Sequence, residues 1–227
     1  MYRRSATELN QKGLTPKSRS GQFLTSPHRL LLARGFTMAS LNLVRLGALG
    51  AILAGVSWIA SSLLAAAVAS GQSPEVLGFA SLNEALYVVS VAGTMGGIIG
   101  LHARQAPSYG RIGTVGFLAT FTGTALLLVG LILSFTMGSL FGRTLLDYVL
   151  GLGLWCALLG FMALGAATLR LGALPRWCGV LLVISLPLAI ALGDHGGGAV
   201  LGLLWLAVAY ALLSQHDVSA LLRARTK

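Results

Sequence analysis

The residues with the clearest capacity for chemistry are acidic and polar side chains next to long apolar segments. Glu84 lies at the boundary of such a segment, where a carboxylate is costly unless it has a partner or water. Beside it, polar residues and a glycine recur at helical spacing and share one face: Asn83, Tyr87, Ser90, Thr94 and Gly97. This face has two interpretations. It is either a helix-packing seam from which Glu84 reaches outward, or the lining of a polar cavity.

A second group of ionisable residues is expected on the same side of the protein as Glu84. It consists of Arg143, Asp147 beside Tyr148, and the adjacent pair Asp194 and His195. If the helices bring these side chains together, they form an outward-facing acidic site with one basic partner, suited to a cation or a proton. A histidine beside a carboxylate can titrate near neutral pH. The alternative is a set of scattered carboxylates, because positive charge is excluded from that side.

The elements that must position these residues are long apolar helices. Of the 227 residues, 56% are hydrophobic and 10% are charged, and the mean hydropathy is +0.82. An average soluble domain has roughly 25% charged residues, so this composition predicts a lipid environment. The apolar residues form continuous runs and not the alternating pattern of a barrel. Six runs approach the roughly 20 residues of a spanning helix and predict an all-α polytopic membrane bundle: residues 46–69, 80–101, 112–136, 145–169, 177–193 and 196–214.

The Lys and Arg residues predict the orientation of this bundle. Fifteen of the sixteen fall in the N-terminal stretch through Arg45, in the second and fourth connections, or in the C-terminal tail, and Arg143 alone falls on the other side. Positive charge is retained in the cytoplasm, so both termini are expected there. The bundle itself is expected in the inner membrane of a bacterium. The net charge of +10 is therefore an orientation signal, and no nucleic-acid partner is expected.

Residues 1–38 and 216–227 are expected to be basic cytoplasmic tails around a transmembrane domain of residues 39–215. The first tail is polar and has too little apolar surface to fold alone, so we expect disorder. Ser26-Pro27 could nevertheless begin a helix as cap and first position. Alternatively, translation could begin at Met38, which would leave out most of this tail. Ala67-Val68-Ala69 resembles a signal-peptide cleavage site. The apolar run that precedes it is longer than the apolar region of a signal peptide, which favours a first helix that is not cleaved off.

Small residues, one proline and three tryptophans predict how the helices pack. Gly93 with Gly97 and Gly96 with Gly100 form two overlapping GxxxG pairs, which allow another backbone to approach closely. Pro187 falls within the fifth helix, where it removes a hydrogen-bond donor and makes a candidate hinge. The tryptophans near the middles of their helices are expected to pack between helices, away from the interface belt: Trp58, Trp155 and Trp205.

Three hairpins of the same orientation could form a parallel repeat. Arg45, Arg111 and Arg176 open the odd-numbered helices at intervals of 66 and 65 residues, and each is followed closely by a glycine. The acids at the outer ends, Glu84 and Asp147 among them, do not keep this spacing. Basic residues at inner helix ends also occur without any repeat, so both interpretations remain open.

No motif for catalysis, metal or cofactor binding is present in the sequence. It has no HExxH, no GxSxG and no phosphate-binding GxxxxGK[ST], and no pair of histidines lies within the helices. Cys156 and Cys178 form no CxxC pair and have no histidine nearby, so we interpret both as small packing residues. We expect a protein that is not an enzyme and has no cofactor.

The segment 165–181 resembles a turn shared by bacterial multi-pass membrane protein families that lack an assigned activity. In it a helix end rich in small residues leads through Arg170, Gly172, Pro175 and Arg176 to Gly179 and the next helix. The resemblance covers about 20 residues and implies a six-pass bacterial membrane protein, with no activity attached.

Three classes of function remain on these grounds. The first is a non-catalytic assembly or accessory subunit that binds another membrane protein, or a second copy, through its glycine-rich helix faces. The second is a small transporter or channel with an outward-facing acidic site. The third, least favoured by the missing motifs, is an intramembrane enzyme with Glu84 or Asp147 as general base.

Overall fold

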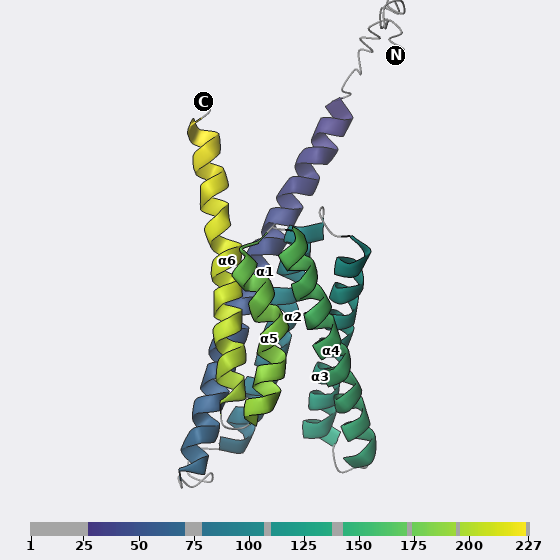
Figure 1. Cartoon of the computed structure of the whole chain (residues 1–227), viewed down its shortest axis with the longest axis vertical. Coiled ribbons are helices and arrows are strands. Elements are labelled where there is room, and N and C mark those ends of the chain that lie inside the picture. The colour runs from purple at the N-terminus through teal and green to yellow at the C-terminus, as the bar shows by residue number, and fades with distance from the viewer. Residues whose placement is uncertain are drawn as a thin grey trace, which may run out of the picture.

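The fold is known from a computed structural model, which describes residues 27–70, 79–106, 110–137, 143–171, 174–193 and 196–225. Side chains are described for most of these residues, excluding 27–41, 79–80, 137, 143, 171 and 215–225. The described chain forms six α-helices (Figure 1): α1 Pro27–Ala69, α2 Phe79–Gln105, α3 Arg111–Met137, α4 Arg143–Leu171, α5 Arg176–Leu192 and α6 Gly197–Arg225. The prediction of an all-α protein is confirmed.

Five helices of the described chain are long and apolar enough to cross a membrane, by length and composition: Asn42–Ala69, Ser81–Gln105, Arg111–Thr136, Thr144–Arg170 and Gly197–Ser214. The remaining helix, α5, is apolar but has 17 residues. Large apolar side chains point away from the bundle along these helices, among them Leu46, Leu118 and Leu203, each more than half exposed. An exterior of this kind is stable in lipid and not in water, so the chain is a multi-pass membrane protein.

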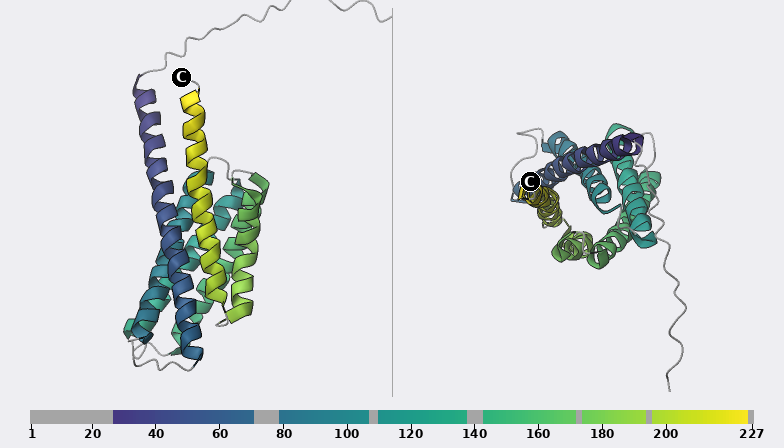
Figure 2. Two further views of the ribbon diagram at one scale, coloured as in Figure 1. Left: turned by 90° about the vertical axis from the view of Figure 1, so that its left-hand side faces the viewer. Right: turned by 90° about the horizontal axis from the view of Figure 1, so that it is seen from above.

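The six helices form a closed ring in chain order. Each helix packs against the next, and α6 packs back against α1. The view along the helices shows this arrangement (Figure 2, right). Short connections make consecutive helices neighbours, so the order of the ring follows from the order of the chain. The hairpins α1–α2, α3–α4 and α5–α6 follow one another around it, although α5 is much shorter than the other helices.

One tight seam of the ring lies between α1 and α2, where glycines let the two backbones touch. A Cβ atom added at Gly93 would lie 2.7 Å from the Ala54 nitrogen and 2.7 Å from the Gly50 carbonyl oxygen. One added at Gly100 would lie 2.7 Å from the Cα atom of Gly47. Only glycine fits such a contact, which brings many atoms of two helices within van der Waals distance.

Glycines close two further seams in the same way. Between α3 and α4, a Cβ at Gly123 would meet the Ala157 nitrogen and lie 2.7 Å from the Gly153 carbonyl oxygen. Between α1 and α6, a Cβ at Gly202 would lie 2.6 Å from the Gly55 carbonyl oxygen. The ring is therefore held by close backbone packing, as expected in lipid, where burial of apolar surface drives no association between helices.

Helix α1 extends well beyond its apolar part. Residues 1–26 of the predicted tail lie outside the described residues, but the structure has helix from Pro27 onward, within the region 1–38 that we expected to be disordered. Proline is well suited to a first helical position, and the Leu, Ala and Arg residues that follow are good helix formers. Helix α6 likewise continues to Arg225, through most of the predicted C-terminal tail. Both extensions project from the same end of the ring (Figure 2, left).

The connection between α5 and α6 is short and depends on glycine. Gly193 has a φ of 50° and donates its N–H to the carbonyl oxygen of Ala189, and Gly196 has a φ of 130°. These backbone conformations favour glycine strongly. The structure describes the two ends of this connection, Gly193 and Gly196, while Asp194 and His195 lie outside the described residues.

Candidate functional site

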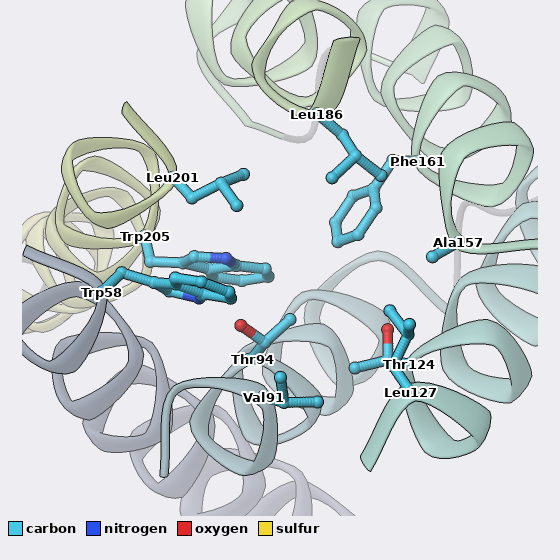
Figure 3. A pocket seen from close by; sticks show the side chains of 10 residues that line it. All are labelled: Trp58, Val91, Thr94, Thr124, Leu127, Ala157, Phe161, Leu186, Leu201 and Trp205. Atoms are coloured by element: carbon cyan, nitrogen blue, oxygen red, sulfur yellow. The ribbon is translucent and has the colours of Figure 1, made fainter. Parts of the chain in front are cut away.

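A cavity of about 50 Å³ lies inside the ring, and every helix contributes to its wall (Figure 3). About 10 to 15 Å³ holds one water molecule, so this space has room for a few waters or a molecule of a few non-hydrogen atoms. The lining residues come from near the middles of their helices: Trp58 (α1), Val91 and Thr94 (α2), Thr124 and Leu127 (α3), Ala157 and Phe161 (α4), Leu186 (α5), Leu201 and Trp205 (α6).

The wall of the cavity is mostly apolar but carries polar atoms that the protein leaves unused. The Trp58 Nε1 and Thr94 Oγ1 atoms are buried and have no hydrogen-bond partner among the described residues. Thr124 also lines the space, and its hydroxyl donates to the carbonyl oxygen of Thr120 at 2.7 Å, which leaves lone pairs free to accept. The surface that faces the space is nevertheless almost entirely apolar, because the two unpartnered atoms are themselves buried.

Aromatic rings fix the shape of one side of this space. The Trp58 ring meets the Tyr87 ring edge-on, with centroids 5.4 Å apart, and the Phe161 and Trp205 rings meet in the same manner at 6.0 Å. Trp205 is 1% exposed and packs against Gly97, where an added Cβ would lie 2.9 Å from its Cε3 atom. The rings are therefore positioned by contacts with residues on other helices.

The polar face predicted on α2 divides into several environments. The Ser61 hydroxyl of α1 donates to the Asn83 side-chain oxygen at 2.8 Å, so this part of the face binds a neighbouring helix. The Ser90 hydroxyl donates at 2.6 Å to the backbone carbonyl of Leu86, within α2. Of the predicted site residues whose side chains are described, Thr94 lines the cavity, and the Tyr87 ring contacts the lining residue Trp58. The residues of this face therefore meet different surroundings: a neighbouring helix, the backbone of α2 and the cavity wall.

Only part of the predicted acidic site falls within the described residues. Glu84 is half-buried at the start of α2 and does not line the cavity, and Asp147 is exposed on α4. The side chain of Arg143, and all of Asp194 and His195, lie outside the described residues. No group of three or more His, Cys, Asp or Glu side chains that could hold a metal ion occurs in the described part of the chain.

The four glycines predicted to pack helices lie on two surfaces. Gly93, Gly96 and Gly100 face α1, whereas Gly97 faces Trp205 of α6. Pro187 lies within a continuous α5 and is exposed. A proline at this position cannot bond to the carbonyl one turn earlier, which is the physical basis of the predicted hinge.

One tryptophan differs from the prediction. Trp58 and Trp205 lie inside the ring, but Trp155 is 64% exposed on the outer face of α4 and does not pack between helices of this chain. Helix α4 is apolar around most of its circumference, so its sequence does not show which side faces inward. The same reason hides Thr124 and Phe161, which sequence reasoning missed as cavity residues.

A polar contact bridges the ring near the end that carries the α1 and α6 extensions. The Gln105 side chain of α2 is fully buried and donates to the Thr168 hydroxyl of α4 at 3.2 Å. Thr168 in turn donates to the Leu164 carbonyl oxygen at 2.9 Å. Because α2 and α4 are not consecutive helices, this contact bridges the ring beyond the cavity.

Comparison of the chain with protein-family models, with curated proteins and with solved structures gave no match.

Proposed function

We propose that this protein is a six-span carrier that moves a small solute across the membrane through its central cavity, without changing the solute chemically. The observation that carries the proposal is a cavity with walls from all six helices. A solute in contact with every helix can bias the arrangement of the whole ring. Such coupling between occupancy and conformation is what a carrier requires.

The six-span topology is proposed with both termini in the cytoplasm of a bacterial cell and the ring in the inner membrane. The 17 residues of α5 correspond to about 25 Å of helix, at the short end of the lengths that cross a bilayer. Its place between α4 and α6 in the ring supports a sixth span. The distribution of Lys and Arg supports the orientation.

The topology is tested by fusing a fluorescent protein that matures only in the cytoplasm to the C-terminus, and in parallel to a chain ended after Gly193. With six spans and the N-terminus inside, the full-length fusion should fluoresce and the shortened fusion should be dark. If α5 does not cross the membrane while α6 does, the pattern should be reversed, with a fluorescent shortened fusion and a dark full-length fusion.

An assembly or accessory subunit was the first class predicted from sequence, and it remains a second hypothesis. It depended on glycine-rich faces that would be available to a partner. Gly93, Gly96 and Gly100 contact α1 of the same chain, so this surface is already occupied. The proposal therefore favours transport.

A transported cation was the substrate expected from the outer acids. Neither Glu84 nor Asp147 lines the cavity, and the ten residues that do line it have no ionisable side chain. The acids thus give no support to a cation site at the centre of the ring, and transport is proposed on the cavity alone.

The proposal is tested by reconstituting the purified protein in liposomes and measuring uptake of acetamide, glycerol and methylammonium. At least one solute should enter several-fold faster than it enters protein-free liposomes. Thr124→Leu should remove this increase, because leucine extends the side chain into the cavity and breaks no bond between helices. Uptake equal to that of empty liposomes for every solute would contradict the proposal.

A further inference from the structure

We infer that Arg111, Arg170 and Arg176 together bind the headgroup of an anionic phospholipid on the outside of the ring, at one edge of the membrane. The three arginines belong to α3, α4 and α5, which follow one another around the ring. The inference concerns a lipid partner of the outer surface and is independent of the carrier function. It needs α3 and α4 to span the membrane, which their length and apolar composition allow.

The contacts between α3 and α4 place Arg111 beside Arg170. The two helices are antiparallel neighbours (Figure 1), and a Cβ atom added at Gly116 would lie 2.7 Å from the Leu164 nitrogen. Five residues from Gly116 toward the start of α3 is Arg111, and five residues from Leu164 toward the end of α4 is Leu169. Arg111 is therefore level with Leu169 and Arg170 on the neighbouring helix.

The contacts between α4 and α5 place Arg176 beside Arg170. A Cβ atom added at Gly165 would lie 2.7 Å from the Gly179 carbonyl oxygen, and one added at Gly179 would lie 2.9 Å from the Leu169 Cδ2 atom. Arg170 directly follows Leu169, and Arg176 is the first residue of α5. The axes of packed helices lie roughly 8–10 Å apart, a distance that two extended arginine side chains can bridge through a common anion.

All three arginine side chains are exposed, and two of them continue the apolar outer faces of their helices. On α3, Arg111 precedes the exposed residues Val115 and Leu118 at helical spacing, and on α4, Arg170 shares a face with the exposed Leu159. Such apolar faces contact acyl chains in a membrane. The arginines at their ends thus lie where the hydrocarbon stops and the headgroups begin.

The positive charge at this edge has no carboxylate beside it among the described side chains. Glu84 and Asp147, the two acids whose side chains are described, lie near the starts of α2 and α4, at the opposite end of the ring. Neighbouring guanidinium groups repel one another, so an anion between them is favoured. Arginine binds phosphate oxygens through two parallel N–H bonds, which makes a phosphate the best-matched anion.

Trp177 indicates that this phosphate belongs to a lipid. It directly follows Arg176 and is 40% exposed. An indole ring with an apolar body and one N–H donor is favoured at the level of the headgroups. A phospholipid supplies a phosphate for the arginines, ester oxygens for the indole N–H and acyl chains for the apolar faces. Free phosphate supplies only the first of these.

The experiment compares phosphatidylglycerol and phosphatidylcholine, each with brominated acyl chains, as quenchers of Trp177 fluorescence in mixed bilayers. Bromine quenches a tryptophan that it contacts, so quenching reports which lipid occupies the site. Trp155→Phe is introduced first, because Trp155 is 64% exposed on α4, whereas Trp58 and Trp205 line the interior of the ring. We expect phosphatidylglycerol to bind about fivefold more tightly, the ratio expected from one basic residue at an anionic surface.

Arg170→Gln removes the central guanidinium group and should lower this preference to less than about twofold. Glutamine remains polar, and the position is exposed, so the fold should be retained. Arg45→Gln is the matched control, because Arg45 is an exposed arginine near the same end of the ring but lies on α1, which adjoins α2 and α6. It should leave the fivefold preference unchanged. Both variants are first checked for helical circular dichroism and a single elution peak.

Three results would overturn the inference. The first is equal quenching by the two lipids before any arginine is replaced. The second is an equal loss of preference in Arg170→Gln and Arg45→Gln, because the preference would then follow total charge and not this site. The third is relief of quenching by inorganic phosphate but not by sodium chloride at the same ionic strength, because the site would then recognise free phosphate. None of these results bears on solute uptake, so the carrier function is tested separately.

Discussion

Gly93→Leu should prevent the protein from reaching its folded state in most molecules. Any side chain at this position meets the backbone of α1, with the Ala54 nitrogen and the Gly50 carbonyl oxygen both 2.7 Å from the Cβ atom. Backbone atoms within a helix cannot move aside without separating α1 from α2 along their whole seam. Overpacking of this kind typically costs about 1–3 kcal/mol and more where nothing can yield, so we expect a loss of at least 3 kcal/mol. The yield of monodisperse protein and the unfolding midpoint in detergent measure the effect.

Gly151→Leu is the matched control for this change. Gly151 also lies within a long apolar helix, but a Cβ atom added there has nothing within 4 Å. Leucine has a higher helix propensity than glycine, by roughly 0.8 kcal/mol, so this variant should be as stable as the wild type or slightly more stable. Equal stability of the two variants would show that the α1–α2 seam is not packed as described.

Trp205→Ala should destabilise the protein strongly, whereas Trp155→Ala should not. Trp205 is 1% exposed, meets the Phe161 ring at 6.0 Å and fills the space beside Gly97. Its removal leaves a large void between α2, α4 and α6. Large-to-small substitutions of buried aromatic residues cost about 3–5 kcal/mol. We expect the lower value, roughly 3 kcal/mol, because a helix that separates from its neighbours in a membrane is exposed to lipid and not to water. Thermal unfolding in detergent provides the measurement.

Trp155 offers the comparison because it is the same residue type near the middle of a helix and is 64% exposed. Lipid or detergent can fill the space that its ring leaves, so its replacement by alanine should change the unfolding free energy by less than about 1 kcal/mol. If Trp155→Ala proved as damaging as Trp205→Ala, the outer face of α4 would have to be buried, for example against a second copy of the chain.

The helices themselves could be predicted from the sequence because a segment in lipid must satisfy its own backbone hydrogen bonds, and long apolar runs can do this only as helices. The outer end of α1 was placed correctly at Ala69, and the start of α3 within one residue, at Arg111. The predicted spans 46–69 and 196–214 agree closely with the apolar segments Asn42–Ala69 and Gly197–Ser214, but the helices α1 and α6 continue beyond them. Hydropathy marks where a helix leaves the lipid, not where the helix ends, so the extensions from Pro27 and to Arg225 carried no signal.

The cavity could be predicted only in part. Thr94 was identified because α2 has a visible polar face. Helix α3 has no face with ionisable or amide side chains, and two of its threonines make the same local contact: Thr124 and Thr136 each donate to the carbonyl oxygen four residues earlier at 2.7 Å. One lines the cavity and the other is exposed. The difference arises from closure of the ring, which depends on contacts among all six helices and leaves no periodic pattern in any one of them.

The most direct test of the central claim, that solute passes through the cavity inside the ring, is acetamide uptake by liposomes that contain Thr124→Leu or Thr136→Leu. The two variants make the same chemical change on the same helix, and each breaks a hydrogen bond to its own backbone only. We predict that Thr136→Leu takes up acetamide at the wild-type rate and that Thr124→Leu is no faster than protein-free liposomes. Uptake at the wild-type rate in Thr124→Leu would contradict the account, because solute would then be crossing by a path outside this cavity.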